Sequence, residues 1–187
     1  MIESLNMEKP ADMSKFLVIS ALGHDQPGIV DELSRVILDC QCNIVDSRMS
    51  VLGGEFAVIL LVAAPGGQQL AKLQARLPQL EDSIGLTLIT RETSRKEPAP
   101  GLVPYEVSAV AIDHPGIVHQ IARFFSSQGI NIENLTTDRY AAAHTGTPMF
   151  AMHMQISVPA DIKIGGLRAR FLEFCDELNI DASLTTG

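Results

Sequence analysis

The sequence predicts an α+β protein built from two copies of one unit, in which the order is strand, helix, strand, strand, helix, strand. The stretch DQPGIV at residues 25–30 returns 88 positions later as DHPGIV. At that offset, ten of the 25 residues from Ser20 to Ile44 are identical, which indicates an internal duplication. Around each copy, apolar residues alternate at strand spacing and then recur at helical spacing.

The first half begins with KFLVISALG, which has the alternation of a strand. Pro27 is then expected near the first helical position, where its fixed φ and missing N–H do no harm. NIVDSRMSV and EFAVILLVA are predicted strands on either side of LGG, whose glycines suit a tight hairpin. GLTLITR closes the unit as a fourth strand. The two predicted helices bury apolar stripes formed by Ile29, Val30, Leu33, Val36 and Ile37 and by Leu70, Leu73, Leu77 and Leu80.

The second half repeats this order from YEVSAVAID to NIDASL, with one helix from Pro115 and another that carries Leu167, Phe171 and Phe174. Its middle hairpin is expected to be longer by about six residues, in AAAHTGTP. This lengthened loop is either tolerated surface or a contact loop. The order is that of the ferredoxin-like βαββαβ fold, an antiparallel sheet with both helices on one face.

The predicted domains follow from the repeat and from composition. Residues 1–14 are expected to form a polar N-terminal arm, and residues 15–91 the first domain. Residues 92–103 are charged and rich in proline, which is typical of a linker. Residues 104–187 form the second domain.

The third strands of the two units predict different outer faces. Ala57, Ile59 and Leu61 alternate with the core positions of the first unit. The matching residues of the second unit are Ala151, His153 and Gln155. Because an uncovered apolar sheet face usually meets another surface, we expect self-association or a partner at the first unit. The chain is therefore predicted to form a homo-oligomer.

Composition narrows the function classes. The net charge of −8 and the absence of a Lys/Arg cluster argue against direct binding of nucleic acid. The longest apolar run, residues 56–64, is too short to cross a bilayer, and the N-terminus lacks the apolar core of a signal peptide. We therefore expect a cytoplasmic protein without a membrane contact. The three cysteines fit reduced thiols that pack at helix ends better than a disulfide framework.

Catalysis has little support in the sequence. The five histidines show no metal-ligand spacing such as H-E-x-x-H, and His153 on a strand is expected to be a surface residue. No glycine-rich phosphate loop or nucleophile elbow occurs. We therefore predict no catalytic residue, no metal site and no cofactor.

The repeated turn between first strand and first helix is the candidate site. The first N–H groups of a helix lack partners within it and, with the helix dipole, attract a carboxylate. An acid could receive an ammonium group, a glycine lets a ligand approach the backbone, and an amide offers donors and an acceptor. A free amino acid fits this set, although capping, turn and helix-stop roles explain the same residue types. The candidate ligand-binding residues are Asp25, Gly28, Ile29, Asn43, Asp113, Gly116, Ile117 and Asn131.

The βαββαβ order, together with DQPGIVDELSRVILDCQCNI and DHPGIVHQIARFFSSQGINI, resembles the ACT domain. That resemblance implies a small regulatory module that binds amino acids at interfaces between paired copies. It places the ligand loops at residues 25–29 and 113–117 and the amides at Asn43 and Asn131. The first copy departs from the pattern, because CQCNI stands where the second copy has SQGINI. We expect this loss of glycine to reshape the first site, so the two sites should be unequal.

A tandem of two such domains with TGTPMF in a longer second hairpin is similar to the glycine cleavage system transcriptional repressor group. This resemblance implies glycine as the ligand and repression through a LysR-type transcription activator rather than through DNA. The acidic chain, which lacks a helix-turn-helix domain, agrees with action on a protein. The alternative is an ACT-type regulatory subunit that binds and controls a metabolic enzyme.

Overall fold

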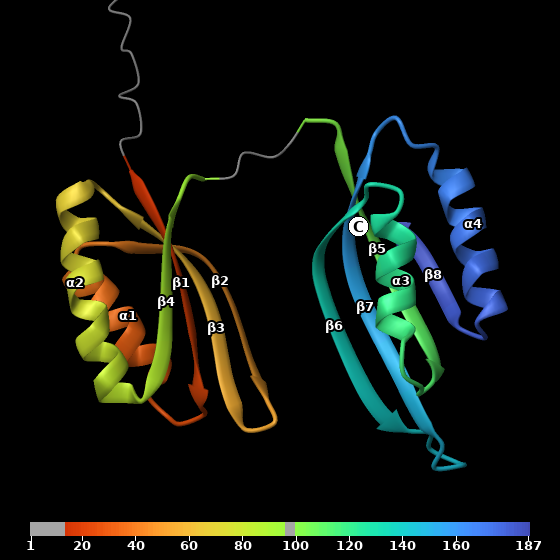
Figure 1. Cartoon of the computed structure of the whole chain (residues 1–187), viewed down its shortest axis with the longest axis horizontal. Coiled ribbons are helices and arrows are strands. Elements are labelled where there is room, and N and C mark those ends of the chain that lie inside the picture. Colours follow the sequence, from red (N-terminus) through yellow and green to blue (C-terminus); the bar gives the residue numbers. More distant parts are fainter. Residues whose placement is uncertain (1–13, 96–99) are drawn as a thin grey trace, which may run out of the picture. The chain divides into compact units, whose positions relative to one another are not determined.

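The computed structural model describes residues 14–95 and 100–187, which fall into two compact units (Figure 1). All of the predicted N-terminal arm except Ser14 lies outside the described residues, and so do residues 96–99 of the predicted linker. No helix in the described part of the chain is both long enough and apolar enough to cross a membrane.

The first unit is one antiparallel sheet with the strand order β2-β3-β1-β4. Helices α1 and α2 both lie on one face of it (Figure 1). Its elements are β1 (Lys15–His24), α1 (Ile29–Asp39), β2 (Asn43–Leu52), β3 (Glu55–Ala64), α2 (Gly67–Ile84) and β4 (Leu86–Thr93).

The second unit repeats this arrangement with the strand order β6-β7-β5-β8 and two helices on one face. Its elements are β5 (Leu102–Ile112), α3 (Ile117–Ser126), β6 (Asn131–Ala141), β7 (Pro148–Pro159), α4 (Ile164–Glu177) and β8 (Asp181–Thr186). The predicted fold, two ferredoxin-like βαββαβ domains in tandem, is confirmed.

Each unit has its own core between its sheet and its helices. In β3 and β7 the burial alternates along the strand as predicted, because successive side chains point to opposite faces. The second core is the more aromatic: Phe125 and Phe171 are fully buried, with ring centroids 5.0 Å apart. Phe124 packs on both of these rings and on Phe174. These cores fix the helix starts against the strand ends, where the candidate site lies.

The middle hairpins differ as the sequence predicts. Gly53 and Gly54, with φ of 61° and 88°, form the two-residue turn between β2 and β3. This backbone suits a type I′ hairpin, which needs positive φ at both positions. In the second unit, residues 142–147 join β6 to β7. The longer loop lies next to the repeated turn, because the Asp113 N–H donates to the Pro148 carbonyl at 2.9 Å.

The first helix of each unit begins later than Pro27 and its counterpart suggested. Helix α1 begins at Ile29, so Pro27 stands before the capping residue Gly28 rather than in the first turn. Gly28 and Gly116 have φ of 98° and 103°. A Cβ atom would meet nothing within 4 Å at either position, so crowding does not explain the glycines. The left-handed backbone is what favours glycine at both positions.

The backbone of CQCNI in the first unit, which lacks the glycine, follows the same path as SQGINI in the second unit. Gln41 has φ of 58° where its counterpart Gly129 has φ of 70°. In both units the chain closes the helix with the paired hydrogen bonds of a Schellman motif, which include Cys42 N–H to the Ile37 carbonyl and Ile130 N–H to the Phe125 carbonyl. The loss of glycine in CQCNI therefore leaves the backbone path of this helix end unchanged, because glutamine adopts the left-handed conformation.

Replacing Gln41 with glycine should stabilise the first unit by about 1 kcal/mol, because a residue with a Cβ atom is strained in this conformation. Urea unfolding of Gln41→Gly and of Gly129→Ala would measure the effect, and the two substitutions should shift stability in opposite directions. An unchanged midpoint for Gln41→Gly would show that this position is not strained.

The cysteines pack at helix ends, as expected. Cys40, Cys42 and Cys175 are buried free thiols. Burial, followed by the charge of Asp176, raises the pKa of Cys175 to about 11. This thiol therefore stays protonated at physiological pH.

Cys175 should resist alkylation at pH 8 in the folded protein, since the thiolate is the reactive form. In the unfolded chain its pKa returns to about 8.5. Its contribution to folding stability is therefore complete below about pH 8.5 and falls as pH rises toward 11. Mass spectrometry after timed iodoacetamide treatment checks this, and fast native labelling of Cys175 would contradict it.

Candidate functional site

Unpaired backbone donors stand at the start of α1 and of α3. The first helical hydrogen bonds are Glu32 N–H to the Gly28 carbonyl and Gln120 N–H to the Gly116 carbonyl, each 2.9 Å. The N–H groups before these have no acceptor within the helix. No side chain caps either helix start, so neither Asp25 nor Asp113 is an N-cap. Both turns are therefore open to a ligand acceptor.

The second turn adds an ion pair to these donors. Arg139 Nε lies 2.7 Å from Asp113 Oδ2, and the carboxylate side chain is only 26% exposed. Arg139 comes from β6, where it pairs in register with Phe150 of β7. A hollow of about 430 Å³ lies against the turn, and its lining residues are Asp113, His114, Gly116, Ile117, Val118, His119 and Phe150.

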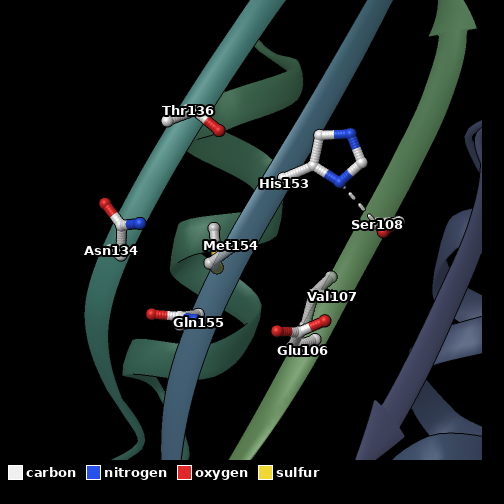
Figure 2. A pocket seen from close by; sticks show the side chains of 8 residues that line it. All are labelled: Glu106, Val107, Ser108, Asn134, Thr136, His153, Met154 and Gln155. Atoms are coloured by element: carbon white, nitrogen blue, oxygen red, sulfur yellow. Dashed lines mark hydrogen bonds between the residues drawn. The ribbon is translucent and has the colours of Figure 1, made fainter. Parts of the chain in front are cut away.

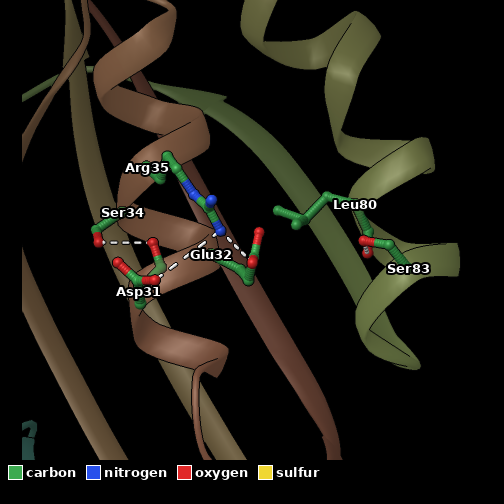
Figure 3. A network of polar contacts seen from close by, with 6 residues as sticks. All are labelled: Asp31, Glu32, Ser34, Arg35, Leu80 and Ser83. Atoms are coloured by element: carbon green, nitrogen blue, oxygen red, sulfur yellow. Dashed lines mark hydrogen bonds and ion pairs between the residues drawn. The ribbon is translucent and has the colours of Figure 1, made fainter.

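The first turn has different chemistry at the equivalent positions. Val51 stands where the second unit has Arg139, and Asp31 stands where it has His119. Arg35 pairs with Asp31 and with Glu32 one helical turn from the start of α1 (Figure 3). Arg35 offsets only one of these two carboxylate charges, so the start of α1 disfavours an anion, while the guanidinium of Arg139 beside α3 attracts one.

The two asparagines lie far from the turns of their own domains. In the first unit Asn43 pairs in register with Ala63, while the Asp25 N–H bonds the Gly54 carbonyl at the other end of β3. That separation along the strand is about 30 Å. Asn131 pairs with Ser157 and hydrogen-bonds Glu133 at 2.7 Å, likewise at the far end of β7 from Phe150. One small ligand therefore cannot touch both the turn and the asparagine of one domain.

Asn43 instead lines another hollow, of about 480 Å³, beside the end of α1. Its lining also includes Arg35, Ser34 and Cys42. The structure thus brings together Asp113, Gly116 and Ile117 in the second unit, and it places Asn43 and Asn131 elsewhere.

The outer face of the second sheet is polar, as predicted. A shallow hollow of about 230 Å³ crosses β6, β7 and β5 there, lined in part by Glu106, Asn134 and Gln155 (Figure 2). Ser108 Oγ lies 3.2 Å from His153 Nδ1 on this face. His153 is an exposed strand residue, as expected.

The second turn can hold a small zwitterion. The carboxylate of an amino acid would accept hydrogen bonds from the first N–H groups of α3, and its ammonium group would donate to Asp113. The guanidinium of Arg139 has five N–H donors and uses Nε on Asp113, which leaves others for the ligand carboxylate. Sequence reasoning missed Arg139. The signal was its replacement of Val51 at the repeat offset.

No group of three or more His, Cys, Asp or Glu residues that could hold a metal ion occurs within residues 14–95 and 100–187. The site is therefore a set of backbone donors, one acid and one guanidinium. The chemistry of this set suits an organic ion that carries both charges.

Comparison with known proteins identifies the first unit as an ACT domain. The ACT-domain model matches residues 15–90, and the second unit repeats the topology of that domain. A UPF0237 protein of Methanococcus maripaludis is 33% identical over 73 residues, which are 38% of this chain and 81% of that protein.

The chain is also similar, along most of its length, to the glycine cleavage system transcriptional repressor of Escherichia coli (strain K12). The two are 29% identical over 171 residues, which cover 90% of this chain and 88% of the relative. The crystal structure of a protein provisionally assigned as such a repressor is 25% identical, with a TM-score of 0.71 over 92% of this chain and 97% of that one. These likenesses support a regulatory role.

Proposed function

We propose that this protein senses a small amino acid through the second turn and regulates transcription of the glycine cleavage system. The observation that carries the proposal is the Asp113–Arg139 pair beside the open start of α3. It stands in a chain whose relative along 90% of its length is a glycine cleavage system repressor. In this proposal the protein is a cytoplasmic regulator rather than an enzyme.

The proposed ligand is glycine or a similarly small amino acid. Its carboxylate binds the N–H groups at Gly116 and Ile117 and the free donors of Arg139, and its ammonium group binds Asp113. The apolar side chains of Val118 and Phe150 line the rest of the hollow. The first turn, at Asp25, Gly28 and Ile29, is the weaker site, because it lacks the arginine and carries Asp31.

Asn43 and Asn131 enter this proposal only through a paired domain. Since each lies about 30 Å along the strand from the turn of its own domain, an asparagine would have to reach a ligand held by another copy. Binding at interfaces between paired copies is what the ACT resemblance implies. Asn131→Ala should then weaken amino-acid binding only under conditions in which copies associate.

The proposed protein partner is a LysR-type transcription activator. A net charge of −8 disfavours a direct DNA contact, so repression would act through a protein. The loop at residues 142–147 borders the ligand turn, and it is longer than its counterpart in the first unit. In this proposal the protein partner contacts this loop and so responds to the bound ligand.

Affinity capture on the full chain, with and without 5 mM glycine in the buffer (about that concentration is enough to fill a weak site), would test the partner. The proposal predicts recovery of a LysR-type activator in a glycine-dependent manner. Recovery of a metabolic enzyme and of no LysR-type protein would instead support the alternative, an ACT-type subunit that controls an enzyme.

A further inference from the structure

The outer face of the first sheet is apolar at its centre and uncovered by the helices of its own unit. Ile59 is 47% exposed, Ile89 is 67% exposed and Leu22 is 56% exposed. Val18 and Leu61 lie on the same face. The matching positions of the second sheet include His153, Gln155 and Glu106, which are polar and line the hollow in Figure 2. The centre of the outer face is therefore apolar in the first sheet and polar in the second.

We propose that this face binds the same face of a second copy of the chain, around a two-fold axis that runs parallel to the strands between β3 and β1. This inference is independent of the ligand. Two identical faces that meet across a two-fold axis must be self-complementary, and aligned stacking is a common way for sheets to pack.

The strand registers show this self-complementarity. We call residues that are paired in register across the four strands a row. The axis sets β2 of one copy over β4 of the other, and β3 over β1, and each row then lies over the same row of the other copy. In one row, Leu61 pairs with both Asp46 and Val18, and Val18 pairs with Arg91. The operation therefore places Asp46 of each copy over Arg91 of the other, and Leu61 over Val18.

A second row behaves in the same way. Glu55 pairs with His24 and with Leu52 in register. The same axis places Glu55 of each copy over His24 of the other. In one of the two rows between them, Ile59 pairs with Ser20 and Arg48, and Ile89 extends that row on β4. Acids thus face bases at both ends of an apolar centre, and like charges do not meet in these rows.

The area of the outer face of the first sheet shows how large the dimer interface would be. Four strands spaced by about 4.8 Å and roughly ten residues long cover about 19 Å by 34 Å. Two such faces bury about 1,300 Å² in total, which lies near the lower end of specific interfaces. We therefore expect a dimer that dissociates on dilution.

Sedimentation velocity of the full chain across a hundredfold dilution series tests the proposal. The wild type should pass from dimer to monomer. Ile59→Asp should raise the dissociation constant at least tenfold, whereas His153→Asp, the matched change on the second sheet, should leave it within twofold. A wild type that stays monomeric throughout, or an Ile59→Asp variant that dimerises like the wild type, overturns the proposal.

Charge reversal tests the axis itself and avoids a core change. Arg91→Asp alone should raise the dissociation constant at least tenfold, and Asp46→Arg with Arg91→Asp should return it to within about threefold of the wild type. Dimerisation that tolerates the single reversal, or that the double reversal fails to restore, rejects this two-fold arrangement. Thermal melts of each variant confirm that the first unit remains folded.

Discussion

Asp113→Ala and Arg139→Ala should each weaken binding of a small amino acid by about 10- to 100-fold, and they should remove most of the ligand-induced rise in melting temperature. Hydrogen bonds to charged groups contribute about 1.5–3 kcal/mol, and each variant removes one charged partner of the ligand. A ligand raises stability only in proportion to its occupancy. Melting curves at a series of amino-acid concentrations give the measurement.

The matched control for this prediction is Asp25→Ala, the same change in the first unit. Asp25→Ala should change the affinity for the amino acid by less than about twofold, because the first turn lacks the arginine. The ligand-induced rise in melting temperature should therefore stay close to that of the wild type. Without ligand, Asp113→Ala should melt within a few degrees of the wild type, since partly exposed ion pairs contribute only about 0–1 kcal/mol. Equal losses from Asp25→Ala and Asp113→Ala would show that the two turns are equivalent.

Phe125→Ala should destabilise the second unit by about 3–5 kcal/mol, because it removes a fully buried ring from an aromatic cluster and leaves a cavity. The same residue lies on α3, whose first turn forms the ligand site. Amino-acid binding should therefore be lost over the temperature range in which this unit unfolds. Scanning calorimetry of the full chain would resolve the transition.

The matched change in the first unit is Ile37→Ala, at the same place in the repeat. It should cost about 2–5 kcal/mol and lower the transition of the first unit. Because each unit has its own core, each variant should lower one transition and leave the other within a degree or so. A single transition that both variants shift alike would show that the two units unfold together.

The fold was accessible from the sequence because strand and helix periods are local signals that appear twice. The alternation of apolar residues alone predicts that residues such as Val58 and Met152 are buried, and the two glycines of the first hairpin predict its turn. The conformation of Gln41 was not accessible in this way. Glutamine carries no left-handed signal, and only the tertiary position of its helix end imposes that backbone.

The candidate site was predictable only in part. The open helix starts follow from the strand, turn and helix order around Gly28 and Gly116. The separation of Asn131 from its turn depends on the length of a helix and on the direction of the next strand. The place of Arg139 depends on the β6–β7 register, which includes a bulge between Ile132 and Asn134. Motif spacing carries none of this information about register.

Calorimetric titration of the ligand-free full chain with each of the common amino acids tests the central claim most directly. We expect saturable heat with glycine or another small amino acid, with about one strong site per chain and loss of that site in Arg139→Ala. No saturable heat from any amino acid at millimolar concentration would contradict the claim, and the open start of α3 would then be a structural turn only.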